Sequence, residues 1–171
     1  RVRSGDLTVT SKVKDAIHTN EAFVMDNGIL SLNSADDGIQ VDAGYAIIND
    51  GTLNIEANGK GITADNEDED PDVTPYLVIN GGNITVIGQD EGLESKGDLT
   101  INDGQIVCKT SDDCINATNN IYINGGHIYA YAIGNDAIYT NGLLTVTGGI
   151  VLAAGARQPE ASFDCDARTF K

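Results

Sequence analysis

The chain has 171 residues, and its 26 acidic residues against 10 lysines and arginines give a net charge of −16. So acidic a surface argues against nucleic acid and anionic membrane surfaces as partners, because both attract basic patches. The apolar runs are far shorter than the roughly 20 residues that a membrane-spanning helix needs. We therefore expect neither nucleic acid binding nor membrane insertion, and instead cation binding, or halophilic or extracellular solubility.

Seven glycines divide the chain into units of nearly constant length. Each follows a short apolar run, and the gaps between them are 23, 23, 31, 22, 22 and 23 residues: Gly5, Gly28, Gly51, Gly82, Gly104, Gly126 and Gly149. A period between about 20 and 50 residues indicates a repeat architecture rather than a closed domain.

Each unit holds three short segments in which apolar and polar residues alternate. In the unit of Gly28, the inward positions are Ile17 after the small residue Ala16, then Phe23 and Met25, then Leu30 and Leu32. Alternation with a period of two is typical of strands. Three strands per unit, with equivalent strands stacked about 4.8 Å apart, predict an all-β fold: a parallel β-helix of six to seven rungs of 22–23 residues.

We expect one β-helix domain over residues 1–171. Both ends fall inside a rung and carry no capping element, so the sequence predicts a fragment of a longer chain or ends that partner chains cover. The long third gap predicts an inserted acidic loop over residues 65–75. After a shorter insertion over 157–162, Phe163-Asp164-Cys165 resembles the opening of a seventh unit.

The three cysteines are predicted to be unpaired. Cys108 and Cys114 occupy inward or small-residue positions, which is typical of small core residues. Cys165 is expected in the same column as Cys114 but two rungs away, beyond the roughly 7 Å Cα separation that a disulfide allows.

Each unit opens with a small residue, such as Gly38, followed by an aliphatic one. Acidic residues recur in register at the two positions before this small residue. The predicted metal ligands are Asp36, Asp37, Asp90, Glu91, Asp112, Asp113, Asn135 and Asp136. Carboxylates stacked about 5 Å apart repel by about 1–4 kcal/mol per pair, and we expect the corner at the small residue to turn them outward. Calcium, which takes 6–8 oxygen ligands, is the predicted cofactor.

Two alternatives to calcium remain open for this stripe of stacked acidic residues. Aspartates are also favoured at solvated turns for their local hydrogen bonds. In addition, Lys60 stands in the acidic column between Asp37 and Glu91, where its charge could neutralise part of the stripe without a metal.

The inserted loop offers a second candidate metal site. Its acidic residues do not match the EF-hand spacing, and a charged loop without metal is the alternative. The candidate ligands are Asp65, Glu67, Asp68 and Asp70.

Candidate sugar contacts are one lysine and four tyrosines. The chain has no tryptophan, so an aromatic platform for a neutral sugar would rest on tyrosines, and ordinary surface tyrosines are the alternative. These candidates are Lys60, Tyr122, Tyr129, Tyr131 and Tyr139.

Rungs of the form Asp-Asp-Gly-Ile at 36–39, with the segments 155–160 and 163–166 after the last rung, resemble a family of bacterial secreted proteins. These are carbohydrate-binding domain-containing β-helix proteins, distantly similar to the family 9 pectate lyases. The resemblance covers essentially the whole chain. It implies a right-handed β-helix that binds calcium, cellulose and acidic polysaccharides such as polygalacturonate.

The related lyases hold calcium on aspartates and use a nearby lysine as base. By resemblance, the Asp-Asp motif falls at Asp36-Asp37 and Asp112-Asp113. Lys60, Lys96 and Lys109 all remain open as the residue that matches the base, so no catalytic residue is assigned.

The expected function is that of an extracellular or cell-surface, calcium-binding, non-catalytic polysaccharide-binding protein. Its expected ligands are acidic sugars such as polygalacturonate, with cellulose as a further candidate. One alternative is a structural subunit that stacks end to end into a fibre or surface layer. The other is a calcium-dependent, pectate-lyase-like enzyme, which is disfavoured because acidic neighbours raise the pKa of Lys60.

Overall fold

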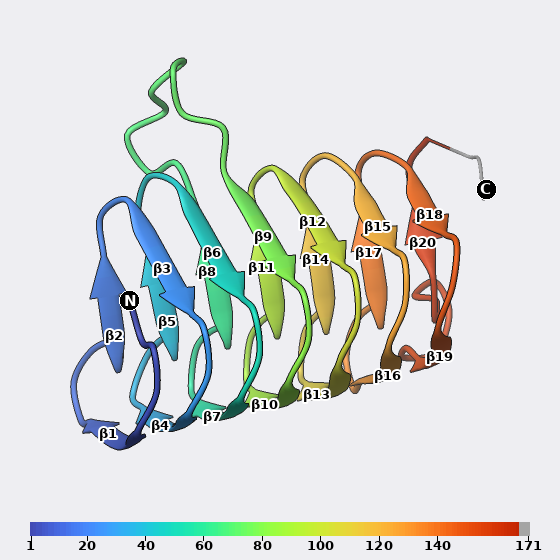
Figure 1. Ribbon diagram of the computed structural model, residues 1–171. Helices are drawn as coiled ribbons and strands as arrows, with labels where there is room; N and C mark the ends of the chain where they lie inside the picture. The colour runs from blue at the N-terminus through green and yellow to red at the C-terminus, as the bar shows by residue number, and fades with distance from the viewer. Residues whose placement is uncertain (168–171) are drawn as a thin grey trace.

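The structure is a computed structural model that describes residues 1–167, and these residues form short strands with no helix among them. The strands make three parallel sheets that wrap around one axis in about seven turns of three strands (Figure 1). The predicted parallel β-helix is therefore confirmed. None of the described residues forms a helix long and apolar enough to cross a membrane.

Sheet I holds the strands that open each unit, most of them three residues long. They are β2 (Ile17–Thr19), β5 (Ile39–Val41), β8 (Ile62–Ala64), β11 (Leu93–Ser95), β14 (Ile115–Ala117), β17 (Ile138–Thr140) and β20 (Asp164–Cys165).

Sheet II holds the strands that precede the corner glycines. They are β3 (Ala22–Met25), β6 (Tyr45–Ile48), β9 (Tyr76–Ile79), β12 (Asp98–Ile101), β15 (Ile121–Ile123) and β18 (Leu144–Val146).

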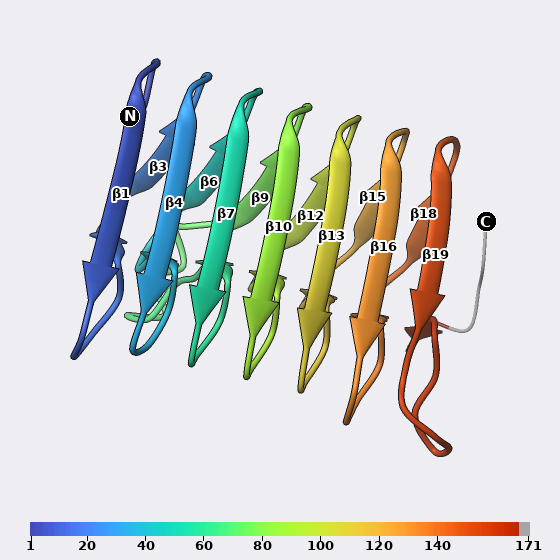
Figure 2. The same ribbon diagram turned by 90° about the horizontal axis from the view of Figure 1, so that it is seen from below.

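Sheet III holds the longest strands, which follow the glycines and lie side by side in one row (Figure 2). They are β1 (Asp6–Ser11), β4 (Ile29–Ser34), β7 (Thr52–Ala57), β10 (Asn83–Gly88), β13 (Gln105–Thr110), β16 (His127–Ala132) and β19 (Ile150–Ala154).

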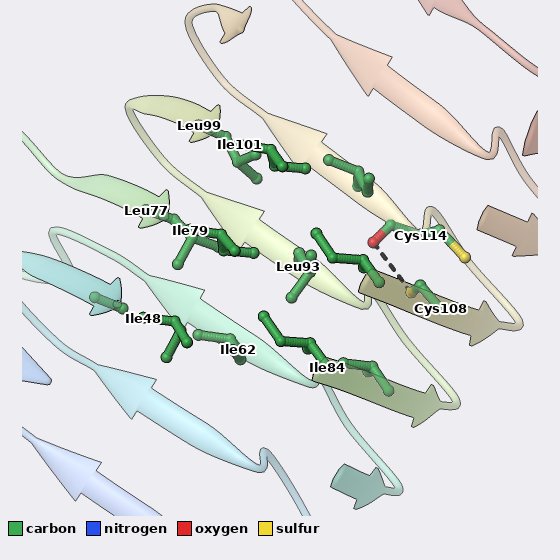
Figure 3. Packing of buried hydrophobic residues seen from close by; sticks show 14 of the residues in the cluster. Ile48, Ile62, Leu77, Ile79, Ile84, Leu93, Leu99, Ile101, Cys108 and Cys114 are labelled. Atoms are coloured by element: carbon green, nitrogen blue, oxygen red, sulfur yellow. Dashed lines mark hydrogen bonds between the residues drawn. The ribbon is translucent and has the colours of Figure 1, made fainter. Parts of the chain in front are cut away.

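The core consists of aliphatic side chains stacked in columns along the axis. Ile48, Leu77, Ile79, Leu99 and Ile101 are all at most 1% exposed and lie over one another within the solenoid (Figure 3). The register pairs equivalent positions of successive units, so each turn buries its apolar face against the turns beside it. Repeats of this kind are stabilised by neighbouring repeats rather than alone.

The corner between sheets II and III requires glycine. All seven glycines that define the repeat have φ between 86° and 118°, a region that residues with a side chain rarely occupy. A Cβ on Gly82 would lie only 2.8 Å from the carbonyl oxygen of Gly51 in the previous rung. Six of the seven corners are therefore too tightly stacked for a larger residue, and only Gly5 has open space beside it.

A ladder of side-chain amides runs beside these corners, two residues before each glycine. The amide nitrogens of Asn80, Asn102 and Asn124 each donate to the side-chain oxygen of the asparagine one rung before, at 2.8 Å. Asp26 and Thr147 extend the ladder at its two ends. The ladder ties six successive rungs together outside the apolar core.

The tail enters sheet I as expected, but in a different register. β20 pairs with β17, and Cys165 lies opposite Thr140. Cys165 therefore does not occupy the small-residue column of Cys114, which corrects the register expected from sequence. Because Cys165 pairs with Thr140, it lies in the column of Ala117. The tail residue that is equivalent to Cys114 therefore lies before Phe163.

All three cysteines are free. Cys108 and Cys114 are fully buried, and the Cys108 thiol donates to the carbonyl oxygen of Cys114 at 3.4 Å (Figure 3). Both act as small core residues, as predicted.

The acidic insertion connects β8 to β9 and protrudes from the solenoid (Figure 1). Asn66 closes its base: the side-chain amide donates to the carbonyl oxygen of Asp70 at 2.8 Å, and the side-chain oxygen accepts the N–H of Asp70 at 2.9 Å. Gln40 of sheet I also donates to Glu67 at 2.8 Å. The base of the loop is thus bonded to itself and to the solenoid.

Candidate functional site

The acidic columns lie where the chain turns into sheet I, immediately before each short strand. Because the register is strict, equivalent residues of successive rungs stand one rung apart there. The structure nevertheless divides the predicted ligand set into groups with different roles.

Two groups of three carboxylates come close enough to share a cation. One consists of Asp90, Glu91 and Asp112, and the other of Asp15, Asp36 and Asp37. In each group one oxygen per residue lies within 4.8 Å of the others, and all six residues are half-buried. We call them the central cluster and the N-terminal cluster.

The N-terminal cluster already has basic neighbours. The Lys14 ammonium lies 3.5 Å from Asp36, and the His18 ring contacts Asp15 at 2.8 Å and Asp42 at 2.7 Å. These hydrogen bonds to Asp42 and Asp15 raise the pKa of His18, which favours its charged form. This cluster is therefore largely compensated by side chains.

The central cluster is less well compensated. One carboxylate oxygen of Glu91 is buried without a hydrogen-bond partner, and the nearest cation is the Lys60 ammonium at 3.8 Å. Burial, followed by the charge of Glu94, raises the pKa of Glu91 to about 7. This Glu91 oxygen, which has no hydrogen bond and only the distant Lys60 charge, lies beside two further carboxylates. The arrangement fits a hard cation, with waters or carbonyls completing the 6–8 ligands that calcium takes.

Asp113 and Asp136 have a structural role that the sequence reading did not foresee. Each is only 4% exposed, and a carboxylate oxygen of Asp113 accepts the backbone N–H of Asp136, one rung later, at 2.9 Å. Asp136 in turn accepts the N–H of Ala161. The expectation that the corner turns these carboxylates outward is wrong, because they bond along the axis to an N–H that would otherwise have no partner.

The same bond recurs in the N-terminal rungs. The N–H of Asp37 donates to Asp15 at 3.2 Å, and the N–H of Lys60 donates to Asp37 at 2.7 Å. Burial is the main cause of the pKa shifts in this column: it raises the pKa of Asp37 to about 6 and that of Asp113, with help from Asp112, to about 7. Asn135 donates its amide to Asp112, so it neighbours the central cluster.

Lys60 turns toward the outer face of sheet I. Its ammonium bonds to Glu94, a carboxylate that also accepts from Lys96 and from the Thr63 hydroxyl. The Glu94 side chain is 1% exposed, whereas those of Lys60 and Lys96 are 21% and 40% exposed. Two partly exposed ammonium groups thus flank a buried carboxylate beside the central cluster.

These contacts determine the charge of the group. Burial acts to raise the pKa of Glu94, but the bonds to Lys60 and Lys96 outweigh it and the pKa is lowered. Burial likewise acts to lower the pKa of Lys60, but Glu94 and Glu91 outweigh it and the pKa is raised. Both groups therefore carry charge at neutral pH.

The candidate ligands in the inserted loop are not gathered in the same way. Among the described residues, no group of three close ligand atoms includes Asp65, Glu67, Asp68 or Asp70. Glu67 bonds to Gln40, and the Asp70 side chain accepts the N–H of Asp72 at 2.9 Å. These bonds suit a folded charged loop.

The predicted tyrosines do not form one platform, because the structure distributes them over three sheets. Tyr122 lies on β15 of sheet II, Tyr129 and Tyr131 on β16 of sheet III, and Tyr139 on β17 of sheet I. Tyr139 donates to Asp166 at 3.3 Å. Only the two tyrosines of β16 share a face.

A stacked aromatic pair was missed by the sequence reading. The rings of Tyr45 and Tyr76 lie parallel on neighbouring strands of sheet II, with centroids 4.9 Å apart and an interplanar angle of 3°. Both residues stand six positions before a corner glycine. That shared offset was the signal that could have identified the pair.

Comparison with known proteins adds one finding to this geometry. A family model described as carbohydrate-binding domain-containing protein matches residues 2–159, nearly the whole chain. No curated protein and no solved structure matches.

Proposed function

The chain belongs to the family of carbohydrate-binding domain-containing proteins, and we propose that it is a non-catalytic polysaccharide-binding protein that uses calcium. The observation that carries the calcium part of this proposal is the central cluster, in which three carboxylates converge and one oxygen of Glu91 has no hydrogen-bond partner. The polysaccharide part is supported by the family match.

Calcium would relieve an electrostatic cost that the fold creates. Like charges within 5 Å repel by about 1–4 kcal/mol per pair, and Lys60, the nearest cation, is already engaged by Glu94. Asp90, Glu91 and Asp112 would hold the ion, and the bound ion would attract anionic groups of a ligand. The N-terminal cluster is a weaker candidate because Lys14 and His18 already contact it.

We propose acidic sugars such as polygalacturonate as the ligand at this site. A protein with a net charge of −16 repels a uronic acid polymer unless cations lie between them. Calcium on the central cluster at the entry to sheet I, and the exposed parts of Lys60 and Lys96 around Glu94, would supply positive charge where a sugar carboxylate could bind.

A binding role is favoured over catalysis by the state of the lysines. A lysine that acts as a general base must be neutral, which usually requires a lowered pKa. The pKa of Lys60 is instead raised, and both Lys60 and Lys96 bond to Glu94. Lys60 is therefore not prepared to remove a proton from a sugar, and the Lys96 ammonium is engaged by Glu94.

An extracellular or cell-surface location is part of the proposal, because the proposed ligand is a polymer of that environment. Fractionation of the producing cells tests it, and recovery of the protein only inside the cell would contradict it.

The calcium proposal is tested by titration calorimetry of the Asp90→Asn variant against an Asp103→Asn control. Both changes remove one charge, but Asp103 is an exposed corner residue that accepts the N–H of Gly104 at 2.8 Å. We expect Asp90→Asn to weaken calcium binding at least tenfold and Asp103→Asn to change it less than twofold. Equal affinities in the two variants would mean that the central cluster holds no calcium.

The ligand is tested by retention of the protein in gels that contain polygalacturonate, with millimolar calcium or with excess chelator. We expect retention only with calcium and no release of unsaturated, ultraviolet-absorbing product. Steady product formation would overturn the non-catalytic reading, and retention unaffected by chelator would remove calcium from the binding step.

A further inference from the structure

A second surface with a different character lies at the C-terminal half of sheet III. There, on neighbouring strands, Ile150 and Leu152 of β19 are 64% and 61% exposed, and Tyr131 of β16 and Val107 of β13 are 40% and 38% exposed. Figure 2 shows these three strands side by side on the face that sheet III presents. So many exposed apolar side chains in one area commonly mark a binding surface.

The register arranges the outward residues of these strands in three columns, and the column of Tyr131 also contains Lys109 and Ala154. Val107, Tyr129 and Leu152 lie opposite one another in one column, and Gln105, His127 and Ile150 in the next. A shallow groove of about 200 Å³ runs between these two columns and is lined by these side chains. One wall of the groove is entirely apolar or aromatic, and the other offers polar groups.

This surface carries no acidic residue, although the protein as a whole is strongly acidic. The outward residues of β13, β16 and β19 include no aspartate or glutamate, and Lys109 is their only lysine. An anionic polymer would find no calcium cluster here, because both acidic clusters lie at the entry to sheet I. An uncharged ligand would meet neither repulsion nor the need for a metal.

We propose that this face of β13, β16 and β19 is a second, calcium-independent site for an uncharged polysaccharide. The inference rests on the proposed function, from which it takes the class of ligand. Sugar rings have an apolar C–H face, which packs on aromatic and aliphatic side chains, and hydroxyl edges, which need hydrogen-bond partners. Tyr129, Val107 and Leu152 supply the first, and Gln105 and His127 supply the second.

Affinity electrophoresis in gels with hydroxyethylcellulose, an uncharged soluble polysaccharide, tests this site. The variants are Tyr129→Ala and Leu152→Asn, and the control is Ile29→Asn. Ile29 is 44% exposed and lies in the same outward column as Ile150, but at the other end of sheet III. Leu152 is so exposed that its replacement should leave folding intact, even if Tyr129→Ala perturbs the sheet.

We expect hydroxyethylcellulose to retard the parent protein equally with calcium and with chelator. Both test variants should lose at least tenfold in affinity, whereas Ile29→Asn changes it less than twofold. Calcium-dependent retention by polygalacturonate should persist in all three variants, because the central cluster is untouched.

Three results would overturn the inference in distinguishable ways. Binding of hydroxyethylcellulose that neither test variant weakens would exclude this face while leaving the proposed function intact. If polygalacturonate is retained but hydroxyethylcellulose is not, the protein has no site for an uncharged polysaccharide, and the proposed function again remains intact. Sedimentation that shows a dimer in the parent and a monomer in Leu152→Asn would assign the face to a second copy of the chain. Failure to retain either polymer would instead contradict the proposed function itself.

Discussion

At the scale of single residues, Glu94 shows how this solenoid tolerates charge. It points outward from β11, yet its side chain is 1% exposed because Lys60, Lys96 and Thr63 surround it. A buried carboxylate is stable only when it is paired and hydrogen-bonded. Here the two lysines supply the pairing, and Glu94 in turn raises the pKa of Lys60.

Replacing Glu94 with glutamine should therefore destabilise the fold. The two lysines would lose their counter-charge in a partly buried setting, and hydrogen bonds to charged groups contribute roughly 1.5–3 kcal/mol each. We expect a loss of about 1–3 kcal/mol in the free energy of unfolding, measured by urea denaturation. The control is Glu56→Gln on the exposed face of β7, which should change stability by less than about 0.5 kcal/mol. A Glu94→Gln variant as stable as the control would show that the lysines need no counter-charge.

At the scale of elements, the corner between sheets II and III sets the stacking of the rungs. The glycine at each corner has a left-handed backbone, and the asparagine two positions earlier joins the amide ladder. The left-handed glycine lets the chain turn within a few residues. The ladder gives each side-chain amide a hydrogen-bond partner in the neighbouring rung. Both depend on the strict register between rungs.

Adjacent glycines at one corner provide a matched test. Gly82 has a φ of 94°, and its Cβ would lie 2.8 Å from the oxygen of Gly51, whereas the nearest atom to a Cβ on Gly81 is 3.1 Å away. Because a non-glycine residue in this region costs roughly 1–3 kcal/mol, Gly82→Ala should lower the urea midpoint markedly and Gly81→Ala should do so much less. Equal midpoints would mean that the corner can relax around a side chain.

At the scale of the whole molecule, the net charge of −16 and the buried acidic column make stability depend on pH. The pKa values of Glu91 and Asp113 are raised to about 7 and that of Asp37 to about 6, above the values near 4 of unfolded chains. Between about pH 4 and 7 the folded state therefore binds protons that the unfolded state has released. The stability that these groups contribute is present below pH 4 and is lost as the pH rises through 6 and 7.

We expect the metal-free protein, in excess chelator, to melt at a lower temperature at pH 8 than at pH 5. Excess calcium should reduce this difference, since binding at about one hundred times the dissociation constant adds about 2.7 kcal/mol. The double variant Glu91→Gln/Asp113→Asn should show a weaker pH dependence than Asp50→Asn/Asp103→Asn, which removes the same charge at exposed corners. Identical pH profiles for the two double variants would show that the buried column does not control the effect.

The sequence by itself determined the architecture of this protein. Strict periodicity in glycine and in alternating apolar residues is a local property that repeats, so stacking equivalent strands places every inward column in the core without further information. The seven corner glycines, the buried columns and the position of the acidic insertion all followed from it. The register of the tail did not, because an insertion interrupts the period before Cys165.

Only the tertiary structure decided which acidic residues can act together. The sequence put the acids in common columns, but the direction of each side chain depends on what its neighbours leave unpaired. Asp113 and Asp136 turn along the axis to accept backbone N–H groups, whereas Asp90, Glu91 and Asp112 converge. The tyrosines similarly separated onto three sheets, because residues close in sequence lie on different faces once the chain turns three times in each rung.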